Sequence, residues 1–459
     1  MTAVAGAPQR AGTAAPGRRR ATRTSPVRPS GADTRLTLAQ LPAFWVVVAL
    51  IAAGAVTMGG VGWEFLTTYP AAFIVAAVLF ALYAVPFWLF VSELDYLERE
   101  PPLLQAVAFA WGGLVATSVA IAGNTAVQDI IAKLGSPALA ATWGPATAGP
   151  ALEEITKTLG VVAIVLIARG QVNSVLDGVV YGALVGLGFQ IVENVVFAMG
   201  AVAASGQGDA IGPVVTTFLL RGFLAGLWSH TLFGALAGAG IGYLVVRTDR
   251  RLRTRVGVAV MAVLGAWLSH FLWNAPILGD GFGNGAVAVL VVLLLKGLPP
   301  LLLVLLLIRS AHDREADYYV SQLVDLNDPE VVTPRELRAL AAGSRRAGAR
   351  WHARSRAGHQ AYLAVRRLQR AQAQLAVAVS RAQLGAVSAA PGAAHLRGAV
   401  RRHRAEVLRQ RAVLRRLGHP EAYAPADQPG PWRRTGGRIG LVVLAVAVVW
   451  AAVSALGGA

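Results

Sequence analysis

Long apolar segments separated by short polar ones run through most of this chain. A transmembrane helix needs about 20 apolar residues to cross about 30 Å of hydrocarbon. Nine segments approach or exceed this length, with approximate limits of 41–60, 70–92, 103–123, 151–168, 176–199, 213–246, 256–276, 285–308 and 439–456. The pattern therefore predicts an all-α, polytopic membrane bundle of about nine transmembrane helices.

Four of these segments carry polar side chains that lipid disfavours. They are Glu153, Glu154 and Lys157 in the fourth span, Glu193 and Asn194 in the fifth, His230 in the sixth, and His270 and Asn274 in the seventh. An ionisable group inside hydrocarbon costs at least a few kcal/mol, so such groups usually face a bundle interior or a watery cavity and have a function there. These residues form the candidate site.

Their positions along the helices predict one common depth. If the fourth span starts near Pro150, Glu153 lies about 5 Å below the outer boundary at a rise of 1.5 Å per residue. Glu193 and His270 each lie about 9 Å below the outer ends of their spans, and His230 lies about 6 Å below the same surface. Four helices thus bring their polar groups to the outer third of the membrane.

The arginines predict the orientation of the bundle. With the N-terminus inside the cell, Arg169 and the segments 247–255 and 309–438 fall on the cytoplasmic side, as the positive-inside rule requires. The loops expected on the other side are 61–69, 124–150, 200–212 and 277–284, and Lys133 is their one basic residue. We expect a multi-pass protein of the cell inner or plasma membrane with a cytoplasmic N-terminus.

Composition narrows the chemistry further. The 459 residues are 55% hydrophobic and contain no cysteine, which excludes disulfides, thiolate metal sites and a cysteine nucleophile. The net charge is +18. We expect no nucleic-acid partner, because the arginines lie beside hydrophobic spans, where basic segments set topology and bind anionic lipid.

Spacing within the spans indicates which polar residues share a helix face. Glu153 and Lys157 are four residues apart, and so are Phe189 and Glu193, and His270 and Asn274. Glu154 points about 100° away from Glu153, so we expect the two carboxylates to have different partners.

Two kinds of chemistry fit these residues. Two carboxylates in unlike environments suit water activation and leaving-group protonation, and His and Asn side chains would donate hydrogen bonds to an oxyanion. Alternatively, ligands drawn from Glu154, Glu193, His230 and His270 would bind a catalytic zinc ion with one open position.

Rows of glycine predict close helix packing. Gly178, Gly182 and Gly186 repeat at four-residue spacing on the fifth span, and Gly222, Gly226, Gly234, Gly238 and Gly242 follow the same spacing on the sixth. Small residues at this spacing let transmembrane backbones touch.

The polar motifs, in this order, resemble the PrsW family of intramembrane proteases. The resemblance rests on residues 153–157 (EEITK), 189–194 (FQIVEN), His230 and 270–274 (HFLWN), and also on 95–101 (DYLEREP). It covers roughly residues 41–310. This family belongs to a superfamily that includes the CAAX prenyl endopeptidases and bacteriocin-processing enzymes.

The resemblance implies proteolysis of a membrane-embedded substrate. In the best-known relatives that substrate is an anti-sigma factor, a single-span protein cleaved near its extracytoplasmic side. By analogy with the prenyl endopeptidases, Glu153 is expected to be the general base for water, and His270 with Asn274 to stabilise the oxyanion. Glu154 and His230 would assist, and the superfamily has been described both as metallo and as glutamate-type peptidases.

Two residues depart from the prenyl endopeptidase pattern. Glu193 stands where those enzymes have a histidine, and Lys157 lies one residue before the position of their arginine. We count Glu193 among the catalytic candidates and Lys157, Phe189 and Asn194 as supporting residues. The alternative functions are a proton-coupled transporter, because buried acids and histidines also form relays, and a noncatalytic membrane scaffold.

The remaining chain divides into three parts around the transmembrane catalytic core at 41–310. Residues 1–40 are basic and rich in Pro, Gly and Ser, so we expect a disordered cytoplasmic tail. Residues 311–437 are expected to be a cytoplasmic basic helical region, and 438–459 the final span.

Local motifs predict helices in the basic region. Residues 333–336 (TPRE) have the form of a capping box with proline in the first helical turn. The stretches 360–384 and 393–417, separated by Pro391 and Gly392, are expected to form a helical hairpin that binds anionic lipid or a partner.

Overall fold

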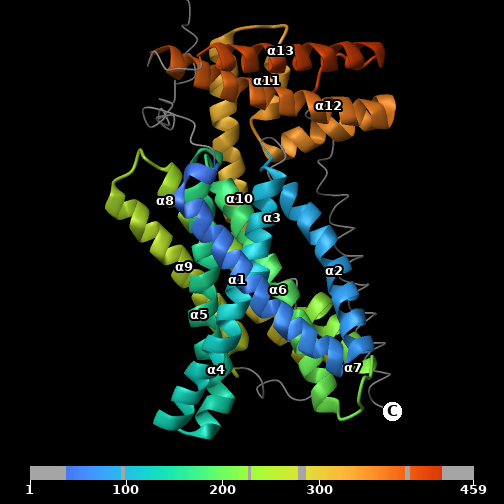
Figure 1. The fold of residues 1–459 in the computed structure, drawn as a ribbon. Coiled ribbons are helices and arrows are strands. Elements are labelled where there is room, and N and C mark those ends of the chain that lie inside the picture. The colour runs from blue at the N-terminus through green and yellow to red at the C-terminus, as the bar shows by residue number, and fades with distance from the viewer. Residues whose placement is uncertain (1–37, 95–98, 226–228, 278–285, 388–392, 426–459) are drawn as a thin grey trace, which may run out of the picture.

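The computed structural model describes residues 38–94, 99–225, 229–277, 286–387 and 393–425, and within these ranges every regular element is a helix (Figure 1). The elements between Leu38 and Ile167 are η1 (Leu38–Gln40), α1 (Pro42–Thr68), α2 (Pro70–Ser92), α3 (Pro102–Ala110), the π-helical η2 (Trp111–Ala116), α4 (Thr117–Leu134) and α5 (Pro137–Ile167). They are followed by η3 (Arg169–Gln171), α6 (Val175–Ser205), α7 (Gly212–Thr217), the π-helical η4 (Phe218–Ala225), α8 (His230–Val246), α9 (Leu252–Asn274) and α10 (Ala286–Leu326). The predicted all-α membrane bundle is confirmed.

Six helical stretches of the described chain are long and apolar enough to cross a membrane: Pro42–Thr68, Pro70–Ser92, Pro102–Leu134, Val175–Ser205, Leu252–Asn274 and Leu294–Leu326. The predicted fourth span corresponds to α5, which carries three charged residues, and part of the sixth corresponds to the shorter apolar helix α8. The predicted ninth span and most of the predicted N-terminal tail lie outside the described residues. The number nine therefore stays a prediction.

The segment 124–150, expected to be a loop, is instead mostly helical. α4 continues to Leu134, and α5 begins at Pro137 after Ser136, whose Oγ accepts a hydrogen bond of 3.1 Å from the backbone N–H of Leu139. The start expected near Pro150 is wrong by thirteen residues, because this proline lies inside α5. Neighbouring helices allow proline within a membrane helix. At 31 residues, α5 is about 46 Å long and exceeds the hydrocarbon thickness.

The expected single span at 213–246 is also interrupted. Its first part forms α7 and η4, and α8 begins anew at His230. Residues 226–228, between the two parts, lie outside the described residues. The candidate histidine is therefore the first residue of a helix rather than part of the middle of one.

The glycine rows pack as predicted, with α6 against α8. A Cβ atom on Gly182 would lie 2.1 Å from the carbonyl oxygen of Gly234, and one on Gly178 would lie 2.3 Å from that of Gly238. Backbone therefore contacts backbone along this interface. Gly222 packs beside Tyr83 on α2 instead, and Gly226 lies outside the described residues.

A second glycine contact joins α3 and η2 to the other side of α6. A Cβ atom on Gly112 would lie 1.9 Å from the carbonyl oxygen of Val185, and one on Gly188 would lie 2.0 Å from that of Phe109. Trp111, the first residue of η2, donates its Nε1–H to the carbonyl oxygen of Thr156 on α5 at 3.0 Å. α6 is consequently the central helix, and its 31 residues are buried over most of their length.

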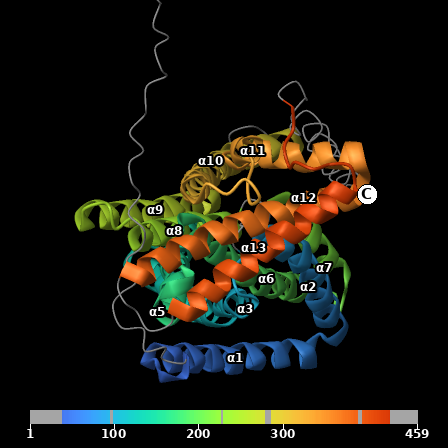
Figure 2. The same cartoon turned by 90° about the horizontal axis from the view of Figure 1, so that it is seen from above.

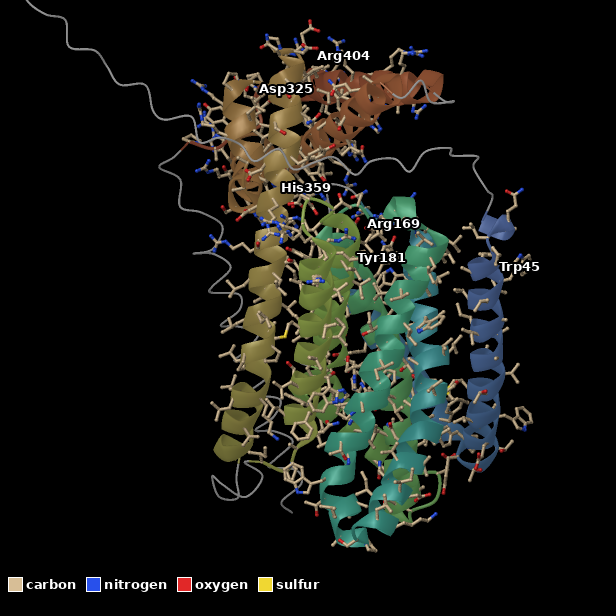
Figure 3. The ribbon with its side chains drawn as sticks, turned by 90° about the vertical axis from the view of Figure 1, so that its left-hand side faces the viewer. Trp45, Arg169, Tyr181, Asp325, His359 and Arg404 are labelled. Atoms are coloured by element: carbon tan, nitrogen blue, oxygen red, sulfur yellow. The ribbon has the colours of Figure 1, made fainter. Side chains whose placement is uncertain are left out.

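Residues 311–387 and 393–425 form a separate helical layer at one end of the bundle, which we call the basic layer (Figures 1 and 2). Beyond the end of α10 it contains α11 (Pro334–Leu340), α12 (Gly343–Val387) and α13 (Ala393–Arg416), and α12 changes direction at Gly358, where φ is +79°. The layer has a hydrophobic core of its own. Figure 3 places Arg169 and Tyr181 at the end of the bundle nearest to this layer.

The predicted capping box at the start of α11 is confirmed. Thr333 Oγ1 accepts from the N–H of Glu336 at 3.3 Å, and Glu336 Oε2 accepts from the N–H of Thr333 at 3.1 Å. The same buried carboxylate accepts from Gln372 on α12 and from Arg411 on α13. The expected helical hairpin is present as the second part of α12 and α13.

We predict that Gly182→Ala destabilises the protein, because the added methyl group would meet the backbone of Gly234. Overpacking of this kind costs about 1–3 kcal/mol. The thermal midpoint of purified protein in detergent measures the effect. Gly200→Ala on the same helix is the control, because a Cβ atom there would meet nothing within 4 Å. Equal midpoints for the two variants would contradict the packing described.

Candidate active site

Four helices bring the predicted polar residues into one cluster. α5 contributes Glu153, Glu154 and Lys157, α6 contributes Glu193, α8 contributes His230, and α9 contributes His270 and Asn274. Glu153, Glu154, Lys157, His230 and His270 are only 1–4% exposed. The side chain of Glu193 is 17% exposed and is the most open of the three acids.

The cluster lies at one level of the bundle. Counted from the helix ends at the basic layer, Glu153 and His230 lie about 21–24 Å along their helices, and Glu193 and His270 about 27 Å. The start of α5 was predicted wrongly, but the four residues still lie at a common level. Their distances from the helix ends at the basic layer agree, and these ends do not depend on where α5 begins.

Glycine packing places the first histidine. A Cβ atom on Gly186 would lie 2.1 Å from the carbonyl oxygen of His230, so only glycine lets the first turn of α8 approach α6 this closely. Phe189, one turn further along α6, packs its ring against the imidazole, with the ring centres 4.8 Å apart. The start of α8 is thereby fixed against α6.

The ring of His270 is oriented by a carboxylate. Its Nδ1 lies 2.8 Å from Glu154 Oε1, and its Nε2 lies 3.2 Å from Asn274 Nδ2. An ionised carboxylate only accepts hydrogen bonds and an amide nitrogen only donates them, so this network assigns the proton to Nδ1 and the lone pair to Nε2. Asn274 also donates to the carbonyl oxygen of Pro145 at 3.0 Å, which ties α9 to α5.

His230 is oriented in the same manner by a different acid. Its Nε2 lies 2.9 Å from Glu193 Oε2, and its Nδ1 lies 2.8 Å from Lys157 Nζ. Since an ammonium group only donates, Nδ1 holds the lone pair and Nε2–H donates to Glu193. Each histidine thus donates one N–H to its own carboxylate and keeps one lone pair inside the cluster.

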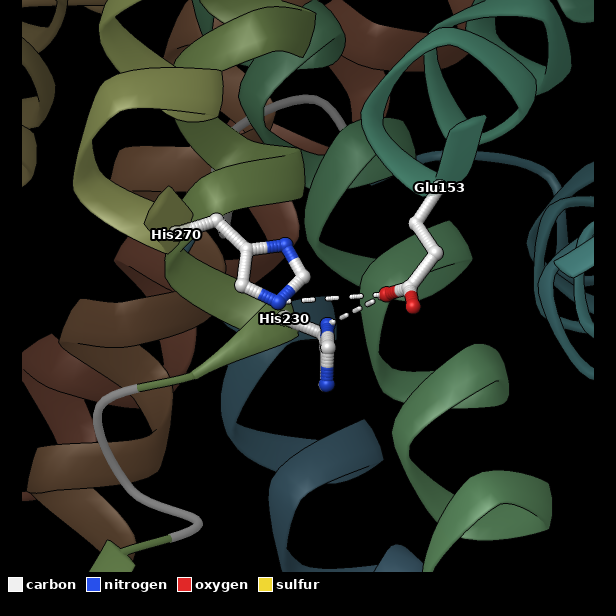
Figure 4. Close-up of side chains that lie close together, drawn as sticks. All are labelled: Glu153, His230 and His270. Carbon is white, nitrogen blue, oxygen red and sulfur yellow. Dashed lines mark ion pairs between the residues drawn. The ribbon is translucent and has the colours of Figure 1, made fainter. Parts of the chain in front are cut away.

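The same two histidine nitrogen atoms, which accept hydrogen bonds from Lys157 and Asn274, also lie near Glu153 (Figure 4). Glu153 Oε2 lies 3.8 Å from His230 Nδ1 and 3.9 Å from His270 Nε2. This oxygen is buried and makes no hydrogen bond to any described residue. It is the one atom of the cluster that both imidazoles approach without forming a hydrogen bond.

The other oxygen of Glu153 has a partner that the sequence analysis missed. Asn124 on α4 donates its Nδ2–H to Glu153 Oε1 at 2.9 Å. Gly149 leaves the space for this pair, since a Cβ atom there would lie 3.0 Å from Glu153 Oε1. Asn124 falls one residue beyond the expected end of the third span, at the start of a more polar stretch of α4, and nothing in the sequence distinguished it from the polar residues that follow.

Lys157 lies closer to Glu154 than to Glu153. Its Nζ is 2.7 Å from Glu154 Oε1 and 3.8 Å from Glu153 Oε2. The ammonium group also stands 4.4 Å from the centre of the Phe189 ring, within cation–π range. The two carboxylates have different hydrogen-bond partners, as expected, but the i, i+4 pairing of Lys157 with Glu153 is not the shorter contact.

A second cation holds the acid on α6. Arg221 on η4 donates to Glu193 Oε2 at 2.6 Å and to Asn194 Oδ1 at 2.8 Å, and its guanidinium carbon lies 3.7 Å from the centre of the Phe197 ring. In the structure Arg221 is a direct partner of the acid that orients His230.

These contacts decide which residues fit a metal ion. Glu153, His230 and His270 each offer one atom that can bind a metal ion, and these three atoms lie within 4.8 Å of one another. The three carboxylates of the cluster face two permanent cations, Lys157 and Arg221, so one negative charge lacks a counter-charge when the histidines are neutral. Two neutral imidazole nitrogens and one unpartnered carboxylate oxygen are a common ligand set for zinc.

The metal ligands that we considered from the sequence were Glu154, Glu193, His230 and His270. In the structure both histidines belong to the metal-sized group, but the acid that accompanies them is Glu153. Glu154 and Glu193 each accept a hydrogen bond from one histidine instead. This is the position of the carboxylates that orient metal-bound histidines in other metal sites.

A comparison with known proteins matches the core of the chain to a family. Residues 100–298 match the sequence model of the PrsW family intramembrane metalloproteases. This range contains every residue of the cluster, including Asn124 and Arg221, and excludes the basic layer. No curated protein and no solved structure matches the chain.

We predict that Asn124→Ala lowers cleavage of a single-span substrate about 10–100-fold, the usual cost of losing a group that orients a ligand. Without the amide donor, Glu153 is free to rotate away from the two histidines. The loss should appear in kcat rather than in KM, and the amount of zinc bound after incubation with zinc, measured by mass spectrometry, should fall. Thr125→Ala is the control, because its hydroxyl bonds only to Ile121 of its own helix. Unchanged kcat and metal content in Asn124→Ala would remove this residue from the site.

Proposed function

We propose that Glu153 is the reacting carboxylate of this chain, which matches the PrsW family of intramembrane metalloproteases through residues 100–298 and is an intramembrane peptidase. The observation that carries this proposal is the oxygen of Glu153 that makes no hydrogen bond to a described residue and lies 3.8 Å from His230 Nδ1 and 3.9 Å from His270 Nε2. Peptide hydrolysis needs one group that activates water and others that receive the charge of the tetrahedral intermediate.

We propose that Glu153 Oε2, His230 Nδ1 and His270 Nε2 bind a divalent metal ion, with zinc as the best match to this ligand set. A bound zinc ion would supply a Lewis acid for the scissile carbonyl and a nucleophilic water. The alternative is a glutamate-type reaction, in which the same Oε2 of Glu153 takes a proton from water directly. Both reactions use the same oxygen atom.

The neighbouring residues have roles that follow from their contacts. Glu154 and Glu193 fix the tautomers of the two imidazoles, and Lys157 and Arg221 pair with these two acids at 2.7 and 2.6 Å. Asn274 Nδ2 donates to His270 Nε2 in this structure, and if this nitrogen binds a metal ion, the released N–H would donate to an oxyanion formed there. Water adds to the carbonyl carbon, the C–N bond breaks, and the proton lost by water goes to the departing amine.

We propose a single-span membrane protein as the substrate, with an anti-sigma factor as the example that the family resemblance suggests. The cluster lies about 21–27 Å from the ends of its helices at the basic layer. If the arginine-rich end is cytoplasmic, as the positive-inside rule predicts, this depth is in the extracytoplasmic half of the membrane. Cleavage would then occur near the outer end of the substrate helix, in the cell inner or plasma membrane.

We predict that Glu153→Gln abolishes cleavage, with a loss of at least about 10³-fold, because the amide neither binds a metal well nor takes up a proton. Glu64→Gln is the control, since Glu64 is exposed on α1. Cleavage by Glu153→Gln at the normal rate would overturn the proposal. Ion flux in liposomes without cleavage of any substrate would favour the transporter alternative.

A chelator separates the two mechanisms. For the unaltered protein we expect cleavage to stop after metal removal and to return with added zinc, accompanied by about one bound ion per chain in mass spectrometry. Full activity in a metal-free preparation would assign the reaction to the glutamate mechanism instead.

The position of the cut tests the proposed side. With a single-span substrate reconstituted in liposomes, mass spectrometry of the products should place the cut in the half of the substrate helix that is remote from the basic layer. Because the chain lacks cysteine, a single cysteine introduced at the exposed Ala405 and probed with a membrane-impermeant reagent in whole cells reports the orientation. A cut in the half nearest to the basic layer would contradict the proposal.

A further inference from the structure

The positive charge of this protein is concentrated in the basic layer. Residues 345–416 contain seventeen arginines, no lysine and one acid, Glu406. That segment alone carries a formal charge of +16 out of the +18 of the whole chain. Such a charge repels itself unless anions from another source lie close to it.

The acids of the chain compensate only some of these arginines. Arg411 pairs with the buried Glu336, Arg404 with Asp328 and Glu330, Arg409 with Glu406, and Arg366 with Glu93. Nine further arginines are exposed and pair with no carboxylate of the described chain: Arg345, Arg354, Arg356, Arg367, Arg397, Arg401, Arg402, Arg415 and Arg416. The uncompensated charge is therefore on the surface, where a ligand has access to it.

Two contacts fix the basic layer at the level where membrane helices end. Arg366 on α12 pairs with Glu93, the residue that directly follows α2, and His312 Nε2 lies 2.7 Å from the carbonyl oxygen of Leu94. Figures 1 and 3 show α12 and α13 running across the end of the bundle rather than along its axis. In Figure 1, α12 lies nearer to the bundle than α13, and the free ends of both helices extend sideways past the adjacent end of α2, over the region that a surrounding bilayer would occupy.

We propose that the exposed arginines of α12 and α13 bind the phosphate headgroups of anionic phospholipids in the bilayer that surrounds the bundle. A guanidinium group offers paired N–H donors that match the oxygens of a phosphate. Basic residues beside a membrane helix are attracted to anionic lipid within about one Debye length of the surface. Nucleic acid offers the same phosphate chemistry, but the lipid surface is already within reach of a layer tied to the end of α2.

The absence of cysteine from the chain allows a direct test on the full-length protein. A single spin label at Ala405→Cys, an exposed position on α13, is compared in nanodiscs of phosphatidylglycerol and of phosphatidylcholine. We expect the collision rate of the label with a water-soluble relaxing agent to fall in phosphatidylglycerol. About 0.5 M salt should largely remove the difference, because salt screens surface charges.

Variants of the arginines then show whether their charge is responsible. Gln is placed at Arg367, Arg401, Arg402, Arg415 and Arg416 together, and Lys at the same five positions serves as the matched control. The concentration of phosphatidylglycerol needed for half-maximal protection should rise at least about tenfold with Gln and much less with Lys. The thermal midpoint in phosphatidylcholine should be the same for both variants, which excludes misfolding as the cause.

Two results would overturn the proposal. One is equal accessibility of the label in the two lipids at low salt. The other is protection by a single-stranded RNA oligonucleotide in phosphatidylcholine nanodiscs together with no protection by phosphatidylglycerol, which would make nucleic acid the ligand. Neither measurement depends on peptidase activity, so this proposal stands or fails separately from the proposed function.

Discussion

Charge pairing inside the bundle is the constraint on which the rest of this structure depends. Isolated ions are costly in a low-dielectric interior, and a buried pair is stable only when hydrogen bonds satisfy the remaining donors and acceptors. The cluster meets this requirement because hydrogen-bond donors and acceptors alternate along it. Lys157 lies between Glu154 and His230. Glu193 lies between His230 and Arg221. Loss of any member leaves a neighbour buried without its partner. The three charged residues on α5 can therefore occupy a membrane protein only because α6, α8, α9 and η4 surround them.

The glycine contacts are what allow these helices to come close enough. A histidine at the start of α8 reaches an acid on α6 only if the two backbones touch, and the interface from Gly178 to Gly186 provides that approach. The electrostatic network therefore depends on the close backbone packing. Polar side chains on neighbouring helices reach hydrogen-bond distance because glycines let the backbones of these helices touch. A bundle of the same length packed through leucine would separate the helix axes and leave the acids unpaired.

The sequence predicted the membrane bundle, the glycine interface and the residues of the cluster. Each can be recognised within a single span, as a long apolar segment, as glycines at four-residue spacing, or as a polar residue among apolar ones. It did not predict the pairing. Whether Lys157 meets Glu153 or Glu154 depends on rotamers and on the imidazole between the helices, not on spacing. Asn124 was missed because apolarity was used to end the third span, whereas α4 continues to Leu134 through a more polar stretch. The start of α5 was misplaced because proline usually begins a helix, and here Pro150 lies within one.

The unpartnered oxygen of Glu153 links the two mechanisms that the residues allow. With three carboxylates, two cations and neutral histidines, the cluster carries one negative charge in excess. The carboxylate oxygen without a hydrogen bond, Glu153 Oε2, is the one that lies near a nitrogen of each histidine. Such an arrangement is stable only with an added positive charge, which is either a metal ion or a proton. A metal ion there gives a metallopeptidase, and a proton taken from water gives a glutamate peptidase. Glu193 does not change this balance, because Arg221 pairs with it and compensates its charge.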